Sequence, residues 1–335
     1  MTRRKNTGRR LSLLPLSFSV CPLARCVSAA SLAVLLQLPA YFSSCTHQRR
    51  LPDDTPIVIH WSTKSAVPET IDLFFFDTLG SQLLDSYQQI STSELATYGL
   101  SRGGVKRLVA LSGQAGETDS WSRIRTYGDL CKHSFSLERE SASAPLLCGE
   151  MLLPEGTSRR AQLYLHPMLS AIRFRSVSCE FRGMPYANSP FLCTRLFLLY
   201  AGAECLPLGE GDGGPVSWLN PGFLDSTAVS RLPEPGLVCQ DGLGPVSERR
   251  IYPDRTFYCY PGAKTHLVLE GSVNGIVCYY PIPLPDLAPD TCVQLDLTLR
   301  RMGSPDPDTP TVSGAIVLEA KVLPWEERDL DTVTY

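Results

Sequence analysis

The stretch VQLDLTL at residues 293–299 decides the fold class, because it alternates apolar and polar side chains without a break. Successive side chains of a β-strand point to opposite faces, so this pattern predicts a strand with one face on a core and the other in water. The same period of two recurs in residues 57–61, 162–165 and 316–322. Strands rather than helices are therefore expected to build most of the chain.

Residues 71–76 form a nearly continuous apolar run, IDLFFF, instead of an alternating one. Such a run is typical of a central strand that is covered on both faces. The only stretch that suggests a helix is Ser91–Tyr98, with Ser91 or Ser93 as its N-cap. We expect one central strand and few short helices.

One further strand pattern changes phase along its length. Ile172 and Phe174 share one face, whereas Val177 and Cys179 share the other. A β-bulge adds one residue to a strand and so restores a common face. The sequence therefore predicts a bulge near Arg175–Ser176.

Turns rich in Gly, Pro and Asp separate the strand-like runs. They lie at residues 154–156, 209–214 and 303–308. The expected architecture is all-β, with few short helices and two β-sandwich domains in tandem. The boundary is placed near Pro167, which gives domains of residues 55–167 and 168–335.

Composition excludes several classes of function. The chain has 335 residues, 43% hydrophobic and 19% charged, with a net charge of −3. Its first 44 residues contain six Lys or Arg and no acid, which leaves 25 basic against 34 acidic residues, about −9, on the remainder. A body this acidic is unsuited to binding nucleic acid, because phosphate contacts need a basic surface.

The N-terminus has the pattern of an export signal. A basic segment at residues 2–10 precedes apolar runs at 11–23 and 27–42, and prolines and Arg25 interrupt these runs, which disfavours a spanning helix. The runs end in YFSSC, whose small residues before Cys45 resemble a bacterial lipobox. We expect a signal peptide at 1–44, lipid on Cys45 and a tether at 45–54. The alternative is an ordinary signal peptide followed by an incidental cysteine.

Nine cysteines remain once Cys21, Cys26 and Cys45 are set aside. Nine is odd, so at least one thiol stays unpaired, and no C-x-x-C pair suggests zinc or a redox site. We expect most of them to be small buried hydrophobes, although an oxidising compartment permits disulfides of unspecified connectivity.

Catalytic motifs are missing from the sequence. It contains no G-x-S-x-G elbow, no P-loop and no H-E-x-x-H, and its five His are dispersed. Asp306 and Asp308 are too few acids for a calcium site. The sequence therefore predicts a protein that is not an enzyme and has no cofactor and no metal.

Several stretches, in their order and spacing, resemble fimbrillin-type proteins of the Bacteroidales. They are IVIHW (57–61), IDLFFFDTLG (71–80), LYLHPMLSAIRFR (163–175), THLVLEG (265–271), YYPIPL (279–284), Leu295–Arg300, Gly303–Asp308 and Trp325-Glu326. The C-terminal part is most similar to the FimB-like branch, the minor subunits that anchor a fimbrium to the outer membrane.

That resemblance implies two transthyretin-like β-sandwich domains and assembly by donated strands. The expected protein is a fimbrial anchor or minor subunit, held in the outer membrane by N-terminal lipid, with fimbrial shaft and accessory subunits as partners. The alternative is a surface glycan-binding lipoprotein associated with a nutrient transporter, which would require clustered aromatic side chains on one face.

The candidate donor strand lies near the C-terminus. Its apolar positions are Ile316, Leu318, Ala320 and Val322, which could fill successive pockets in a partner. The alternative, weighed equally, is that this segment is simply the last strand of its own domain.

Overall fold

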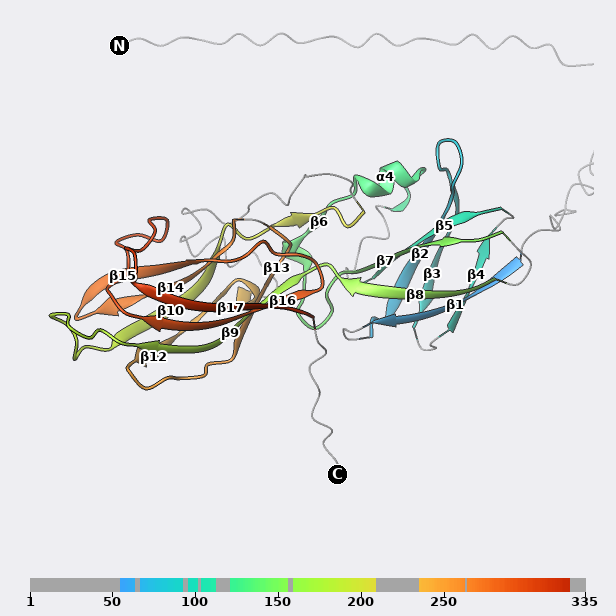
Figure 1. Cartoon of the computed structure of the whole chain (residues 1–335). Coiled ribbons are helices and arrows are strands. Elements are labelled where there is room, and N and C mark those ends of the chain that lie inside the picture. The colour runs from blue at the N-terminus through green and yellow to red at the C-terminus, as the bar shows by residue number, and fades with distance from the viewer. Residues whose placement is uncertain are drawn as a thin grey trace, which may run out of the picture. The chain divides into compact units, whose positions relative to one another are not determined.

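A computed structural model describes eight stretches of the chain (Figure 1). They are residues 55–63, 67–92, 96–101, 104–112, 121–155, 159–208, 235–262 and 264–325. Apart from the helix α4 (Tyr127–Cys131) and two 3₁₀ turns, η1 (Leu137–Arg139) and η3 (Pro235–Leu237), the regular elements in these stretches are strands. The expected all-β class is confirmed. The predicted signal peptide, the tether and the turn at 209–214 lie outside the described residues.

Seven strands from the first half form one sheet in the order β3-β2-β5-β7-β8-β1-β4. In chain order they are β1 (Thr55–Thr63), β2 (Thr70–Asp77), β3 (Leu84–Ser91), β4 (Ala96–Ser101), β5 (Lys106–Ser112), β7 (Leu147–Leu153) and β8 (Arg159–Pro167). The strands at the two ends of this order, β3 and β4, contact each other, so the sheet curls around an interior. Apolar side chains from β2, β5, β7 and β8 fill that interior.

β2 is the central strand that residues 71–76 predicted. Ile71, Leu73 and Phe75 point into the interior of the curled sheet. Phe74 and Phe76 point the other way, into a second core that includes Trp121. All five side chains are essentially buried, so the continuous apolar run reflects cover on both faces.

The helix expected at Ser91–Tyr98 is wrong. Ser91 ends β3, and the later part of the segment is β4, which pairs antiparallel with β1. Strand pairing outweighs the weak helix propensity of so short a segment. The helix that does form, α4, has a capping box: Thr126 Oγ1 accepts from Asp129 N (3.1 Å), and the Asp129 carboxylate accepts from Thr126 N (2.9 Å).

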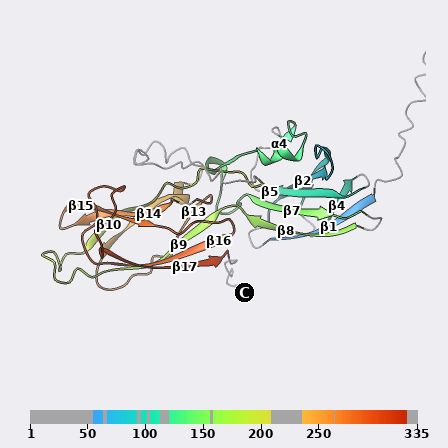
Figure 2. The ribbon, with the colours of Figure 1, turned by 45° about the horizontal axis from the view of Figure 1, so that its top comes forward.

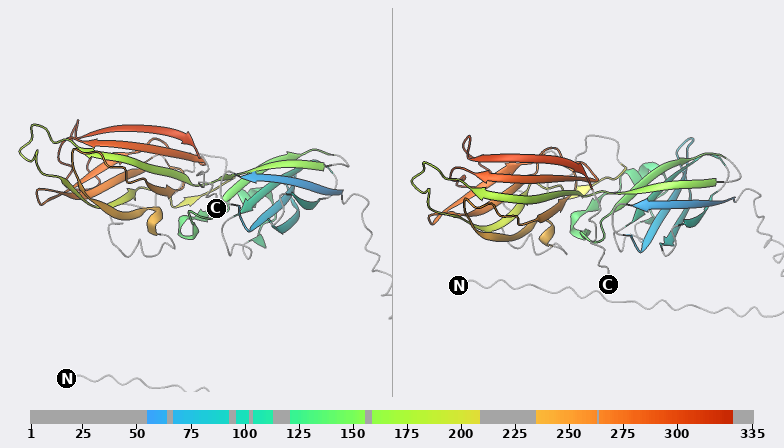
Figure 3. Two further views of the ribbon diagram at one scale, coloured as in Figure 1. Left: turned by 90° about the horizontal axis from the view of Figure 1, so that it is seen from below. Right: turned by 60° about the horizontal axis from the view of Figure 1, so that its bottom comes forward.

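The second half forms two four-stranded sheets that face each other, as both views of Figure 3 show. One has the order β12-β10-β14-β15, with β10 (Phe191–Leu199), β12 (Cys239–Val246), β14 (His266–Val273) and β15 (Ile276–Pro283). The other has the order β13-β9-β16-β17, with β9 (Ser170–Cys179), β13 (Arg255–Cys259), β16 (Thr291–Leu299) and β17 (Ile316–Pro324). Their facing side chains belong to one buried cluster, so this half is a β-sandwich.

The bulge predicted near Arg175–Ser176 is confirmed. β9 runs parallel to β16, with Leu295 opposite Phe174 but Asp296 opposite Ser176. Arg175 is therefore the extra residue. The shift returns the residues before and after it to one buried face.

The chain passes from the end of β8 at Pro167 to the start of β9 at Ser170. A small antiparallel pair, β6 (Phe135–Ser136) with β11 (Glu204–Cys205), links the two halves of the sequence. The division into two domains near Pro167 stays a prediction.

Candidate functional site

β17 is the strand that contains the candidate donor residues, and it is an edge strand of its sheet. It pairs antiparallel with β16 along its whole length, from Leu299 opposite Ile316 to Thr291 opposite Pro324. Figures 1 and 2 show the two strands side by side. The segment is thus an edge strand of its own sheet, bonded on one side by β16.

The four candidate positions lie on the inner face of this sheet. Their partners on β16 are all fully buried: Ile316 faces Leu299, Leu318 faces Leu297, Ala320 faces Leu295 and Val322 faces Val293. Burial nevertheless decreases along β17. Ile316 and Leu318 are partly buried against the core, Ala320 is exposed, and Val322 is 53% exposed. The second half of β17 therefore presents inner-face apolar groups to the outside.

Both ends of β17 are held in place. Before it, Ala315 is buried and its carbonyl accepts from Arg300 N (2.7 Å). After it, Trp325 N donates to Asp290 O (2.8 Å), and the Trp325 ring lies 5.5 Å from the Tyr258 ring. Both ends of β17 are therefore fixed by hydrogen bonds, whereas its inner-face side chains are exposed at Ala320 and Val322. Sequence reasoning gave no structural role to Trp325, whose contact with Tyr258 spans a long separation in the chain.

Strict alternation predicts that the outer face of β16 lies in water, but one end of that face is covered. Thr298 is only 7% exposed, and its Oγ1 accepts from Arg250 Nη2 (2.9 Å). Arg250 Nη1 also donates to Ser176 Oγ (3.0 Å). A segment that follows β12 covers these hydroxyls, since Ile251 bridges to Val177. Nothing in the alternation around Thr298 signals this cover.

The predicted lipid site, Cys45, lies outside the described residues, and so does the basic pair Arg49-Arg50. The first described residue, Thr55, begins β1, which lies between β8 and β4 inside the first sheet. None of the described helices has the length and apolarity needed to cross a membrane.

The nine described cysteines, from Cys131 to Cys292, are not joined in disulfides. Six of them are buried, and burial raises the pKa of Cys148 to about 12 and that of Cys193 to about 11. A thiol with so high a pKa is scarcely ionised near neutrality and is a poor nucleophile. The expectation that most are small buried hydrophobes is confirmed for these six.

Groups able to bind a metal are not assembled in the described part of the chain. It contains no cluster of three or more His, Cys, Asp or Glu residues placed to hold a metal. Asp306 accepts hydrogen bonds from Asp308 N (3.1 Å) and from Thr309 N (2.8 Å) instead, which is an ordinary turn.

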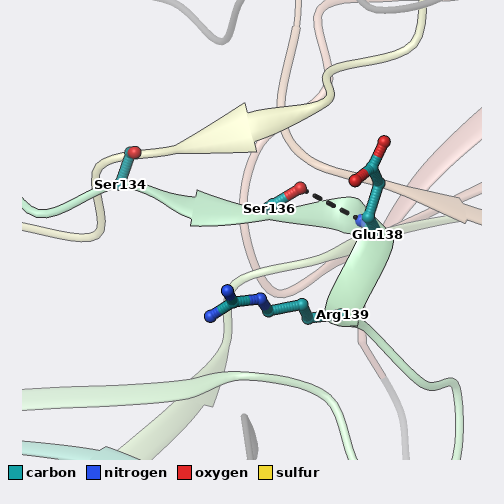
Figure 4. A pocket seen from close by; sticks show the side chains of 4 residues that line it. All are labelled: Ser134, Ser136, Glu138 and Arg139. Carbon is teal, nitrogen blue, oxygen red and sulfur yellow. Dashed lines mark hydrogen bonds between the residues drawn. The ribbon is translucent and has the colours of Figure 1, made fainter. Parts of the chain in front are cut away.

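One hollow, of about 300 Å³, is lined by Ser134, Ser136, Glu138 and Arg139 (Figure 4). Its lining is polar, and Ser136 Oγ accepts from Glu138 N (3.2 Å) to cap the η1 turn. Ligand pockets are mostly apolar and concave, with a few convergent polar groups. This hollow does not have that character.

Exposed aromatic side chains are few in the described stretches. The large ones with substantial exposure are Tyr164, on β8, and Tyr252, on the segment between β12 and β13. Of the Trp residues whose side chains the structure describes, Trp121 is buried and Trp325 is partly buried. The aromatic platform that a glycan-binding function would need is not formed by these residues.

Comparison with known proteins gives matches in structure but not in sequence. A scan against protein-family models finds no match, and a search of curated proteins finds none either. Among solved structures, a candidate cell adhesion protein from Bacteroides eggerthii matches with a TM-score of 0.64 and 17% identity, over 82% of this chain and 96% of that one. The fimbrilin FimA from Porphyromonas gingivalis W83 matches with a TM-score of 0.56 and 11% identity, over 82% of this chain and 98% of that one.

A candidate cell adhesion protein from Parabacteroides distasonis also matches, with a TM-score of 0.59, 11% identity, and coverage of 82% of this chain and 97% of that one. These similarities extend over nearly the whole of each solved chain. The protein therefore has the fimbrillin-type fold, and the structural resemblance predicted from the sequence is confirmed.

Proposed function

We propose that the protein is a non-enzymatic fimbrial subunit, an anchor or minor subunit held in the outer membrane by lipid on Cys45. It joins shaft and accessory subunits by strand addition and supports cell adhesion. The observation that carries the proposal is β17, an edge strand with apolar inner-face residues left open, within a fold shared with a fimbrilin.

The edge position of β17 supports strand addition. An edge strand has one neighbour, so its second side is available to the main chain of a partner. Ala320 and Val322 are the inner-face residues that a partner could reach without displacing the core, because both are exposed. If the whole strand were donated, Ile316 and Leu318 would also leave their own core and pack in the partner.

The position of β1 suits an anchor better than a shaft subunit. β1 is bonded on both sides, by β8 and β4. Cleavage at Arg49-Arg50 would release the lipid but would leave this strand in its sheet. If β1 is retained, its place in the sheet is not available to a strand donated by another subunit. Such a chain would terminate a fibre at the membrane.

Lipid on Cys45 would provide the attachment. Each buried CH₂ of an acyl chain contributes about 0.8 kcal/mol, so two or three chains give stable anchoring without a spanning helix. Mass spectrometry of the N-terminal peptide tests this directly. We expect an acylated Cys45 in the wild type and an unacylated, released protein for Cys45→Ser, and an unmodified Cys45 in the wild-type peptide would end the lipid proposal.

Purification from outer membranes tests the partners. Fimbrial subunits should co-purify with the wild-type protein after mild detergent extraction. A matched preparation of Cys45→Ser, recovered from the soluble fraction, separates attachment to the membrane from attachment to the fibre. If transporter components co-purified instead of fimbrial subunits, the glycan-binding alternative would replace this proposal.

A further inference from the structure

Lys106, the first residue of β5, buries a charged side chain at one end of the curled sheet. The residue is only 3% exposed, and it lies on the same face of β5 as Leu108 and Ala110, which fill the interior. Burying an ammonium group is costly unless other groups compensate its charge.

Two carboxylates approach the Lys106 ammonium. Asp77, directly opposite on β2, has its Oδ1 at 2.6 Å from Nζ, and Asp85, on β3, has its Oδ2 at 3.2 Å. The two acids differ in environment. The Asp85 side chain is 4% exposed, whereas that of Asp77 is 46% exposed. One amine thus lies between a buried carboxylate and a carboxylate that reaches water.

A β-bulge brings Asp85 into this position. In the pairing of β2 with β3, Phe75 lies opposite Ser86 but Phe76 lies opposite Leu84, so Asp85 is the extra residue. Bulges re-aim a side chain, and they are frequent where a sheet places a reactive group. Here the bulge brings a carboxylate of β3 to an amine that lies two strands away, across β2.

We propose that Lys106 and Asp85 form an intramolecular isopeptide bond, with Asp77 as the proton carrier. Asp77 accepts a proton from Nζ and passes it to the Asp85 carboxylate, and the neutral amine then attacks Cγ of the protonated Asp85 carboxyl. Asp77 takes a second proton from the attacking nitrogen and delivers it to the departing hydroxyl group, which leaves as water. The ammonium and the carboxylate become one secondary amide and one water, so charge and atoms balance without an oxidant or cofactor.

The arrangement meets the needs of this condensation. Fixed contact between amine and carboxyl replaces a bimolecular encounter, which is a large effect for oriented groups. A second carboxylate within hydrogen-bond distance supplies general acid–base catalysis. The half-exposed Asp77 leaves a route for the released water. The product would cross-link β3 to β5 over β2. None of the residues involved belongs to β17 or to the N-terminal segment, so the proposed bond is independent of the proposed function.

Mass spectrometry of the purified full-length chain, denatured before measurement, tests the bond. The protein should be lighter than its processed sequence by about 18 Da, one water per amide formed. Trypsin should give a branched peptide in which residues 65–102 are joined through Lys106 to residues 103–107. Fragmentation should place the branch at Asp85. Full mass with an unbranched Lys106 would overturn the proposal, and so would a branch at Asp77.

Matched variants separate the chemistry from folding. Lys106→Arg keeps the positive charge but has no reactive amine, so it should fold and keep its full mass. Asp77→Asn keeps a polar side chain beside Lys106 but cannot carry the proton, so it should also keep its full mass. Circular dichroism should show that both variants are folded. If folded Asp77→Asn lost water as readily as the wild type, the role of Asp77 would be refuted.

Discussion

β16 and β17 are neighbours in one sheet and have nearly the same sequence pattern, yet their environments differ. The inner-face residues of β16, from Val293 to Leu299, are fully buried. Their partners on β17 range from partly buried Ile316 to Val322, which is 53% exposed. A period of two determines which face a side chain occupies, whereas the position in the strand order determines how deeply that face is covered. The comparison distinguishes a strand that holds the core from one that can meet a partner.

The largest expected effect comes from placing a carboxylate on each strand. Leu297→Asp buries an unpaired charge, so the free energy of unfolding should fall by more than about 4 kcal/mol. Val322→Asp, on the same face of the sheet, should change it by about 0.5 kcal/mol or less, because the group stays hydrated. Urea denaturation of the two variants measures the difference, and equal midpoints would contradict the contrast between the strands.

Truncation of apolar side chains should give a smaller difference in stability between the two strands, again with the larger loss on β16. Leu297→Ala leaves a cavity in a fully buried site and should cost about 3 kcal/mol. Leu318→Ala, at the paired position on β17, should cost about 1 kcal/mol because less area leaves the core. Thermal unfolding of both variants tests the order, and a larger loss for Leu318→Ala would show that β17 is a core strand.

The smallest expected effect concerns the outer face of β16. Thr298→Val keeps the shape but removes the hydroxyl that accepts from Arg250, at a cost of about 1 kcal/mol. Thr298→Ser keeps the hydroxyl and serves as the control, with stability closer to the wild type. If chemical denaturation gave Thr298→Val and Thr298→Ser the same free energy of unfolding, the hydrogen bond would make no net contribution to stability.

Much of this fold is predictable from short-range patterns. The alternation at residues 293–299 and 316–322 identifies the inner face of both strands, and the phase change around Arg175 identifies a bulge. These features are local because the geometry of a strand is local. The helix expected at Ser91–Tyr98 failed because pairing with β1, a distant segment, determines the structure there.

The features that a single sequence does not reveal depend on strand order and on distant contacts. The edge position of β17 depends on which strands lie beside it, and no residue of β17 encodes this by itself. Arg250 reaches Thr298 from another part of the chain. Asp85 meets Lys106 only through a bulge in a strand whose pattern gave no sign of one.

Capture of a purified shaft subunit by Val322→Lys tests the central claim, that β17 is the strand used in assembly. Glu319→Gln is the control, because it makes the same change of +1 in net charge at an exposed position on the opposite face. Both variants should melt at the wild-type temperature. We predict that Glu319→Gln captures the shaft subunit normally, and that Val322→Lys loses about tenfold or more in affinity because its ammonium would enter an apolar pocket. Normal capture by folded Val322→Lys would contradict the account.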